Sequence, residues 1–398
     1  MTVIAIVGAN LAGGRAAEAL RRRGFDGRIV LLGEEEHAPY ERPPLSKQGL
    51  AADLEPAWLR GPEGWAAIDV EVRTGERVVK LSPGDAALLT ANGHSQRADR
   101  LLLATGGRSR PLRVPGGDLP GVHHLRTHGD AARLRDRLRA GARVVIVGGG
   151  FIGAEVAAAA VTAGCTVTMV ELGPVLMLRG LGPAWGEFVT SEHRRRGVRV
   201  LTRRRVTAVR AAGDAYRVEL DLEQRLIADV LVVGVGMESA VELAQDVGAH
   251  VAGGVVVDAA AATTVPGVWA AGDVTVQPGP DGPVRYESWQ NAAEQADVAA
   301  AAMLGQPLPL RSVPWFWSDQ YDLNLQTAGR LDGSDAVVVR GDPGSSSFSA
   351  FHLSAGRVVG VFAVNRGRDV RAATRLISRG TPVTAERLAD ESADLRRP

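Results

Sequence analysis

The sequence has little cysteine, little net charge and no long apolar run. Its 398 residues include one cysteine, Cys165, which excludes an internal disulfide, a CxxC redox pair and an all-cysteine metal site. The 46 basic and 45 acidic residues give a net charge of +1, so we expect neither a nucleic-acid partner nor a membrane. The single cysteine fits a reducing, cytoplasmic setting. Residues 1–10 are expected not to form a signal peptide, since they lack a basic leader and their apolar run is short.

What the chain does have is glycine, and the 48 glycines cluster informatively. One order of elements (strand, glycine turn, helix, strand) occurs twice, which indicates a duplicated nucleotide-binding unit. The expected elements are a strand at 3–7, a turn at 8–13, a helix at 11–23 and a strand at 28–32, then a strand at 143–147, a turn at 148–153, a helix from about 152 and a strand at 166–170.

The second glycine turn has the full dinucleotide pattern. Gly148 permits the tight turn, Gly150 lets the backbone approach a pyrophosphate, and Gly153 lets the helix pack on the strand. The helix N-terminus then offers free N–H groups to the phosphates. Glu171 ends the next strand, where an acid accepts hydrogen bonds from ribose hydroxyls and repels a 2′-phosphate. This turn therefore predicts NADH binding in preference to NADPH.

The first glycine turn departs from the pattern at its centre. Gly8 and Gly13 are in place, but Asn10 replaces the middle glycine, and its side chain would crowd the pyrophosphate. Glu34 follows the second strand and is the first candidate for a ribose ligand. A solvated acidic loop at 34–36 is the alternative.

The remainder of the chain predicts further strands and a third domain. Buried strands meeting glycine turns are expected at 101–107 and 230–236, and a strand with an acid at its carboxyl end at 268–273. Residues 277–283 are rich in Gly and Pro and predict an exposed loop. From about 310 the composition changes, with antiparallel strands expected at 336–340 and 357–364 and a peripheral tail after 381.

Four strings are more specific than either glycine turn. They are PYERPPLSK at 39–47, LATG at 103–106, WAAGD at 269–273 and PWFWSDQY at 314–321. In this order the chain resembles, over nearly its whole length, the FAD-dependent NADH–ferredoxin reductases of the putidaredoxin reductase type. Members of that family serve cytochrome P450 and ring-hydroxylating dioxygenase systems.

The resemblance implies an α/β fold with two doubly wound, Rossmann-like nucleotide-binding domains and a C-terminal α+β domain. The implied boundaries are 1–107 and 237–310 for a split FAD-binding domain, 108–236 for an NAD-binding domain and 311–398 for a C-terminal interface domain. The implied activity passes electrons from NADH through FAD to an iron–sulfur ferredoxin, of the [2Fe–2S] or a similar type.

The resemblance also assigns residues. Positions matching cofactor contacts are Gly8, Ala12, Gly13, Glu34, Arg42, Lys47, Val78, Arg126, Asp273 and Trp289 for FAD, and Gly148, Gly150, Ile152, Gly153, Glu155, Glu171 and Arg179 for NAD. Catalytic roles fall to Lys47, Glu155 and Trp317. Lys47 matches a lysine beside the flavin N5 edge, where an ammonium stabilises charge that develops on hydride arrival. Glu155 matches the acid paired with it, and Trp317 an aromatic near the flavin and the docking face.

Two other functions remain open at this stage. An NADH oxidase or peroxidase of the same fold commonly uses a redox cysteine, and Cys165 lies on the wrong nucleotide unit for that role. A flavoprotein with a mainly binding or signalling role, like apoptosis-inducing factor, is the other. Cys165 is expected to pack as a small apolar residue, and the arginine runs 194–196 and 203–205 to form a solvated face. The eight histidines show no metal spacing, so no metal site is expected.

Overall fold

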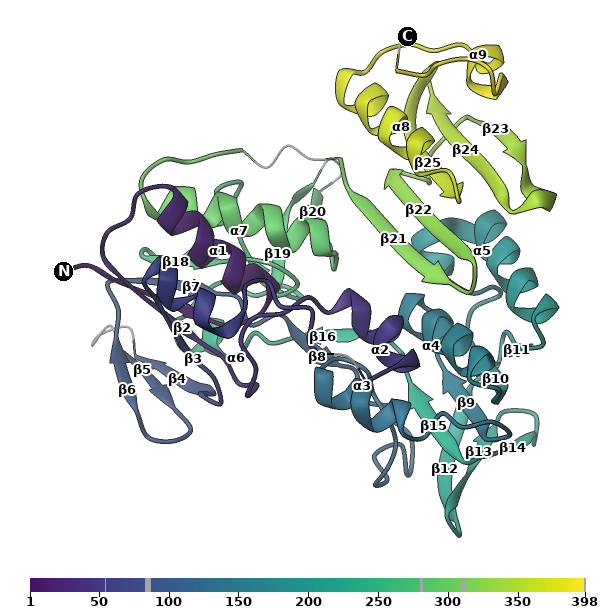
Figure 1. Ribbon diagram of the computed structural model, residues 1–398, viewed down its shortest axis with the longest axis horizontal. Coiled ribbons are helices and arrows are strands. Elements are labelled where there is room, and N and C mark those ends of the chain that lie inside the picture. The colour runs from purple at the N-terminus through teal and green to yellow at the C-terminus, as the bar shows by residue number, and fades with distance from the viewer. Residues whose placement is uncertain (54, 83–86, 280–281, 310–312, 397–398) are drawn as a thin grey trace. The chain divides into compact units, whose positions relative to one another are not determined.

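The computed structural model describes residues 1–53, 55–82, 87–279, 282–309 and 313–396 (Figure 1). It divides into two compact units. Unit 1 comprises Met1–Arg42, Glu55–Arg108 and Met237–Arg311, and unit 2 comprises Pro43–Leu54, Ser109–Gly236 and Ser312–Pro398. The domain boundary expected at 310 lies outside the described residues. Within the described ranges, no helix combines the length and the apolar character needed to cross a membrane.

Unit 1 is built on a five-stranded parallel sheet in the order β18-β7-β1-β2-β3. The strands are β1 (Val3–Val7), β2 (Arg28–Leu32), β3 (Val70–Arg73), β7 (Arg100–Leu103) and β18 (Val268–Ala270). Successive side chains of a strand point to opposite faces, so Ile4 and Ile6 enter one core and Ala5 and Val7 another. Because both faces are covered, the strands are nearly continuous apolar runs.

Helices cover one face of this sheet and short strands the other. Helices α1 (Leu11–Arg22) and α7 (Trp289–Met303) lie side by side, with alanine-rich surfaces in contact (Figure 1). On the opposite face, the core includes side chains from an antiparallel sheet and from a short helix. These side chains come from β4 (Val78–Ser82), β5 (Ala87–Thr90) and α6 (Glu242–Asp246), and β6 (Ser95–Arg97) completes the antiparallel sheet.

Unit 2 contains the second nucleotide-binding sheet, in the order β11-β10-β9-β15. Its strands are β9 (Arg143–Val147), β10 (Thr166–Val170), β11 (Arg199–Leu201) and β15 (Val230–Val233), and its helices are α3 (His128–Arg135), α4 (Phe151–Thr162) and α5 (Leu178–Arg195). An antiparallel sheet of β12 (Val206–Ala212), β13 (Ala215–Leu220) and β14 (Arg225–Ala228) packs on one face through a shared core. Gly182 and Pro183 interrupt α5 with a kink.

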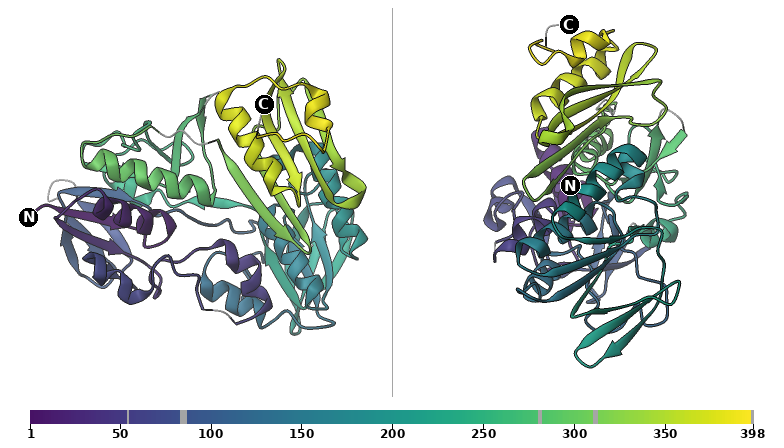
Figure 2. Two further views of the ribbon diagram at one scale, coloured as in Figure 1. Left: turned by 45° about the horizontal axis from the view of Figure 1, so that its top comes forward. Right: turned by 90° about the vertical axis from the view of Figure 1, so that its right-hand side faces the viewer.

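The C-terminal part of unit 2 is an antiparallel sheet with helices, in the order β21-β22-β25-β24-β23 (Figure 2). The elements are β21 (Trp315–Gln320), β22 (Leu323–Gly329), β23 (Ala336–Asp342), β24 (Ser347–Ser354), β25 (Arg357–Val364), α8 (Gly367–Arg379) and α9 (Ala385–Ala389). Helix α8 packs on β25 and β22 and completes the core of this sheet.

Residues 43–54 belong to unit 2 although they interrupt the sequence of unit 1. The 3-10 turn η1 (Pro43–Ser46) and the short helix α2 (Gln48–Ala51) pack against α3 and α4. Lys47 lies between η1 and α2. Contacts with α4 therefore fix its position. The remaining short strands are β8 (Gly107–Ser109), β16 (Met237–Ser239), β17 (Val255–Val256), β19 (Thr275–Gly279) and β20 (Gly282–Val284).

The α/β class and the bounds expected for β1, β2, β9 and β10 agree with the structure. Of the exposed loop expected at 277–283, residues 280 and 281 lie outside the described residues. For the others the expectation of a loop is wrong, since β19 and β20 form an antiparallel ladder that pairs Gln277 with Val284 and Gly279 with Gly282. Proline is tolerated there because Pro283 lies on the edge strand β20 and Pro278 lies beyond the residues of β19 that pair with β17.

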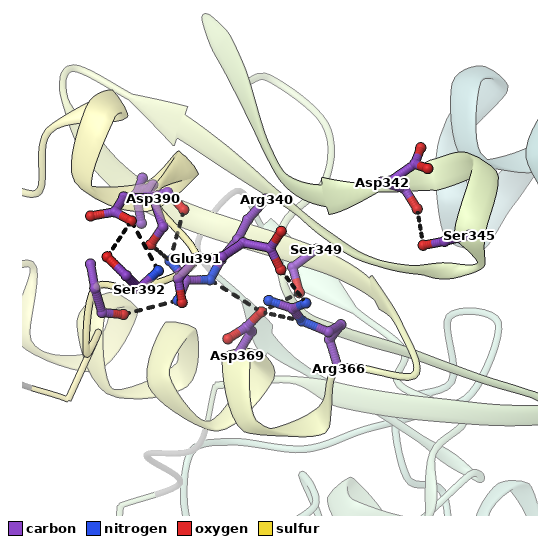
Figure 3. Close-up of polar contacts among 11 residues, drawn as sticks. Arg340, Asp342, Ser345, Ser349, Arg366, Asp369, Asp390, Glu391 and Ser392 are labelled. Carbon is purple, nitrogen blue, oxygen red and sulfur yellow. Dashed lines mark hydrogen bonds and ion pairs between the residues drawn. The ribbon is translucent and has the colours of Figure 1, made fainter.

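The expectation of a peripheral tail after 381 is also wrong. Leu388 and Leu395 are buried in the C-terminal core. The buried Arg340 on β23 donates hydrogen bonds to the backbone carbonyls of Leu388, Asp390, Glu391 and Ala393 (Figure 3). Its guanidinium also faces Asp369 on α8, with Nε 3.6 Å from the carboxylate. Arg340 therefore attaches residues 388–393 to the C-terminal sheet.

We predict that Arg340→Met lowers the stability of the C-terminal domain by about 2–4 kcal/mol, because four backbone acceptors lose a charged donor. Urea unfolding and hydrogen exchange of the amides at 385–395 measure the effect. Arg396→Met is the control, since Arg396 is exposed and pairs with Asp394. Equal losses in both variants would contradict this role for Arg340.

Candidate functional site

In the glycine turn of unit 2, two glycines are required by the chain itself. Gly148 has φ +105°, and a Cβ there would lie 2.3 Å from the carbonyl oxygen of Gly234. A Cβ on Gly153 would lie 2.1 Å from the carbonyl oxygen of Gly148. Both positions therefore exclude a side chain by close backbone contact, which keeps the N-terminus of α4 tight against β9.

Gly150 is different, because nothing in the chain explains it. Its φ of −76° suits any residue, and a Cβ would meet no atom within 4 Å. A glycine at an open position leaves room for a group from outside the chain, as the pyrophosphate of a dinucleotide needs. Glu171 is held beside this turn, because its carboxylate accepts the N–H groups of Gly149 at 2.6 Å and Gly173 at 2.5 Å.

The other residues assigned to NAD surround the same turn. Ile152, in the first turn of α4, is 41% exposed, and Arg179 is exposed on α5 with Nη2 3.8 Å from the point where a Cβ of Gly236 would lie. Leu172, which sequence reasoning missed, is 61% exposed directly after Glu171. An exposed leucine next to an acid that is expected to bind ribose offers an apolar surface to a nucleobase, and its position after the acid was the available signal.

In the glycine turn of unit 1, the first and third glycines are again required by close backbone contacts. A Cβ on Gly8 would lie 2.1 Å from the carbonyl oxygen of Ala104, and one on Gly13 would lie 2.0 Å from that of Gly8. Asn10 is extended, with φ −133°, so no left-handed conformation is needed at the centre. Its side-chain amide nitrogen is buried and makes no hydrogen bond among the described residues. A buried donor at a helix N-terminus fits a phosphate oxygen of FAD as its acceptor.

The remaining FAD candidates are divided between the units. Ala12, Glu34, Arg42, Val78, Asp273 and Trp289 belong to unit 1, and Lys47 and Arg126 to unit 2. Ala12 is buried in the first turn of α1, and its Cβ lies 3.0 Å from the point where a Cβ of Gly272 would lie. Asp273 is the residue directly after Gly272. The side chain of Val78 is buried in the core, Trp289 begins α7, and the backbone N–H of Arg126 donates to Asp130 at 3.0 Å.

Glu34 and Glu35, which follow β2, differ in exposure and in their hydrogen-bond partners. The side chain of Glu34 is 64% exposed, with Nε of Arg77 3.6 Å away. Glu35, which sequence reasoning passed over, accepts a hydrogen bond from the Tyr40 hydroxyl at 2.5 Å and pairs with Arg42 at 2.7 Å. Glu35 therefore fixes the guanidinium of a residue assigned to FAD.

Unit 2 contains a buried ion pair between Lys47 and Glu155. Nζ of Lys47 lies 2.7 Å from Oε1 of Glu155, on α4, and their side chains are 10% and 3% exposed. Glu155 also accepts hydrogen bonds from the hydroxyl of Ser46 at Oε2 and from that of Ser318, at 2.7 Å, at Oε1. A buried carboxylate is tolerated only when it is paired and hydrogen-bonded, and three donors meet that requirement.

Aromatic rings border the ammonium group of Lys47. Its Nζ is 5.8 Å from the centroid of Trp317, which favours a cation. Trp315 and Trp317 stack at 4.9 Å, and Phe316 contacts Phe151 at 4.0 Å between centroids. The structure thus brings Lys47, Glu155 and Trp317 together. A sequence signal for this site is that only Lys47 and Lys80 are lysines, while every other basic residue is arginine or histidine.

A chain of buried polar side chains leads away from Glu155. Nε2 of Gln320 is 3.0 Å from Oγ of Ser318, and Oε1 of Gln320 is 2.9 Å from Nε2 of His193. Nδ1 of His193 is in turn 2.9 Å from the hydroxyl of Tyr321. Ser318, Gln320, His193 and the half-buried Tyr321 are called the buried polar chain below. Sequence reasoning missed all four, because β21 and α5 are far apart in sequence.

Burial keeps His193 neutral. Desolvation lowers its pKa to about 4, against the smaller raising effect of the Gln320 hydrogen bond, and the charge of Arg196 lowers it further. Desolvation also raises the pKa of Tyr321 far above its ordinary value. Arg196 lies 4.6 Å from the ring of Tyr321 and pairs with Glu192 and Asp322. Arg196 therefore departs from the expected solvated face, whereas Arg194 and Arg195 are largely exposed.

Two other expectations concern cysteine and metals. Cys165 is buried, its Sγ lies 3.3 Å from the carbonyl oxygen of Arg139, and burial raises the pKa of its thiol. It therefore packs as a small residue and is a poor nucleophile. In the part of the chain that the structure describes, no group of three or more His, Cys, Asp or Glu side chains is arranged to hold a metal.

Comparisons with known proteins agree with this geometry. Residues 2–296 match the family model described as pyridine nucleotide-disulphide oxidoreductase, and residues 315–398 match the one described as reductase C-terminal. The chain is 41% identical over 396 residues, covering 99% of this chain and 97% of the relative, to the biphenyl dioxygenase system ferredoxin–NAD(+) reductase component of Paraburkholderia xenovorans.

Two solved structures are similar over almost the whole chain. One is the ferredoxin reductase for the CYP199A2 system from Rhodopseudomonas palustris, with a TM-score of 0.95, 37% identity and coverage of 100% of this chain and 99% of that one. The other is a covalent putidaredoxin reductase–putidaredoxin complex, with a TM-score of 0.93, 35% identity and coverage of 99% and 97%.

The neutral His193 predicts a pH-dependent stability. An unfolded histidine binds a proton near pH 6.5, whereas His193 in the folded protein resists protonation down to about pH 4. The contribution of the neutral His193 to the free energy of unfolding is complete above pH 6.5 and is lost as the pH falls. The loss is about 3 kcal/mol at pH 4. Urea unfolding of the wild type and of His193→Gln from pH 7 to 4 measures it. The variant should show a flatter profile, and parallel profiles would contradict the assignment.

Proposed function

The chain belongs to the pyridine nucleotide-disulphide oxidoreductase family, and within it to the ferredoxin–NAD(+) reductases, and from this premise we propose the function. It is a flavoprotein oxidoreductase that passes electrons from NADH through FAD to an iron–sulfur ferredoxin. The ferredoxin feeds a monooxygenase or dioxygenase system, as the relatives' names indicate for those proteins. The observation that carries this function is the pair of glycine turns, one in each unit, with the same backbone constraints.

The residues present fit both coenzymes. Gly150 leaves open space at the N-terminus of α4, and Glu171 is held beside it, which supports NADH at this turn. In unit 1 the buried amide of Asn10 has a donor to offer FAD. Bound FAD would supply the redox chemistry, which joins a two-electron hydride donor to one-electron acceptors. The protein supplies binding, orientation and fixed charge.

The fixed charge is the task we assign to Lys47. Its ammonium is buried, so its field is weakly screened and stabilises negative charge that develops nearby during hydride transfer. The ion pair with Glu155 holds that ammonium in place, and the ammonium lies over the ring of Trp317. Glu171, Ile152, Glu155 and Arg179 are assigned to NADH, and Gly8, Ala12, Gly13, Arg42, Val78, Arg126, Asp273 and Trp289, with Glu34 or Glu35, to FAD.

We assign the domains as the family resemblance divides them, with FAD held by residues 1–107 and 237–310, NADH by 108–236, and ferredoxin met by 311–398. We also propose that the protein works in the cytoplasm, which its single buried cysteine supports, since reducing compartments do not favour structural disulfides. Neither alternative from the sequence has a specific observation in its favour, and Cys165 lacks the low pKa of a redox nucleophile.

The function is tested with the purified protein, FAD and a [2Fe–2S] ferredoxin. We expect NADH to reduce cytochrome c rapidly only when the ferredoxin is present, with NADPH a poorer donor because Glu171 repels the 2′-phosphate. Rapid oxygen consumption with NADH alone, unchanged by ferredoxin, would instead support an NADH oxidase.

Removal of the Lys47 charge should slow the reduction of bound FAD by NADH about a hundredfold, the size found when one electrostatic stabiliser of a transition state is lost. Lys47→Met keeps the length of the side chain without the charge, so FAD affinity should change less. Stopped-flow absorbance measures the rate constant, and a flavin titration measures the affinity.

Lys80→Met is the matched control, because Lys80 is exposed on β4 and is the only other lysine. Its rate constant should equal that of the wild type. An unchanged rate constant in Lys47→Met would remove Lys47 from the catalytic residues.

A further inference from the structure

The buried polar chain has a direction that its chemistry dictates. The Glu155 carboxylate is paired with Lys47 and can only accept, so the Ser318 hydroxyl donates its single proton to Glu155. Ser318 must then accept a hydrogen bond from its other neighbour. The amide nitrogen of Gln320 is that donor, 3.0 Å away.

The same logic passes through the next two residues. With its nitrogen toward Ser318, Gln320 turns its carbonyl oxygen toward His193, and an amide oxygen only accepts. Nε2 of His193 must therefore carry the proton. A neutral imidazole then has a lone pair on Nδ1, which accepts from the hydroxyl of Tyr321. Each of the four side chains donates toward Glu155.

Burying this row of polar side chains lowers the stability of the core, which indicates that the row has a role other than stability. Gln320 is 2% exposed and His193 is fully buried, and polar side chains at such positions stabilise a core less than well-packed apolar ones. Tyr321 also has φ +58° in the two-residue turn between β21 and β22, where hairpin turns need a positive φ and usually carry glycine. A tyrosine at this position is strained, and its side chain contacts His193 and Arg196.

We propose that Gln320 and His193 are positioning residues for the reductase, and that the one-way chain of donors fixes Ser318 and, through it, the Glu155 carboxylate against Lys47. The proposal rests on the function assigned above to Lys47 and Glu155. A chain of aligned hydrogen bonds polarises each member, so its last donor binds the carboxylate more strongly than an isolated serine would.

A consequence is that the Lys47–Glu155 pair sets the direction of the whole chain, because Oε1 of Glu155 accepts from both Lys47 and Ser318. In Glu155→Gln alone, Lys47 keeps the amide oxygen at this position, so Ser318 still donates to it. In the double variant Lys47→Met/Glu155→Gln, the amide can turn its N–H group toward Ser318. Ser318 can then donate to Gln320 with its amide turned over, and His193 can carry its proton on Nδ1 instead of Nε2. The tautomer of a histidine that is not in contact with residue 155 therefore reports on the pair.

The first experiment compares two buried serines on the same sheet. Ser318 and Ser349 are both fully buried, and each donates to a carboxylate, Ser318 to Glu155 at 2.7 Å and Ser349 to Asp369 at 2.9 Å. We expect Ser318→Ala to slow FAD reduction by NADH about tenfold, as loss of one hydrogen bond to a charged group would. Ser349→Ala should lose similar thermal stability without that change in rate. Equal rate effects in the two variants, or none in either, would overturn the proposal.

The second experiment needs neither NADH nor turnover. In protein labelled with ¹⁵N-histidine, with His193 assigned from the His193→Gln variant, we expect the Nε2–H tautomer from pH 6 to 8 in the wild type and in Glu155→Gln, and a mixture with the Nδ1–H tautomer in the double variant Lys47→Met/Glu155→Gln. An Nδ1–H tautomer in the wild type, or no change in the double variant, would overturn the direction argued here. If this signature is found while Lys47→Met reduces FAD at the wild-type rate, the role of Lys47 fails and the polar chain stands.

Discussion

A carboxylate that is turned away from water must find donors within the protein, and Glu155, on α4, finds them in two other parts of the chain. Lys47 and Ser46 come from the segment before α2, and Ser318 comes from β21. Loss of any one donor would leave part of a buried charge unsatisfied, which is more costly than never having built the pair. This requirement therefore joins residues 43–54, the nucleotide sheet and the C-terminal sheet within unit 2.

The two nucleotide-binding sheets, one in each unit, carry out a simpler task. In both, glycines at the first and third positions allow backbone contacts shorter than any side chain permits. The middle position differs, with Gly150 leaving space in unit 2 and Asn10 placing a buried amide in unit 1. The same fold thus presents bare backbone at the centre of one turn and a side-chain donor at the centre of the other.

The sequence predicted well what is encoded locally. Strands β1, β9 and β10 are short apolar runs between turns, and buried parallel strands need little more than that. The β19–β20 ladder was missed because Pro and Gly are typical of loops, and the buried tail because its anchor, Arg340, lies some 50 residues earlier. Lys47 and Glu155 came from resemblance. The roles assigned to individual residues stay predictions. The buried polar chain could not be foreseen, because it depends on β21 packing beside α5.

The claim on which the account depends is that Lys47 and Glu155 act as one unit. A double-mutant cycle tests it most directly, with the rate constant for FAD reduction by NADH measured by stopped flow in Lys47→Met, Glu155→Gln and the double variant. The account predicts that the double variant is no slower than Lys47→Met, since Glu155 acts by holding the Lys47 charge. If the two single effects multiply in the double variant, the residues act independently and the account is contradicted.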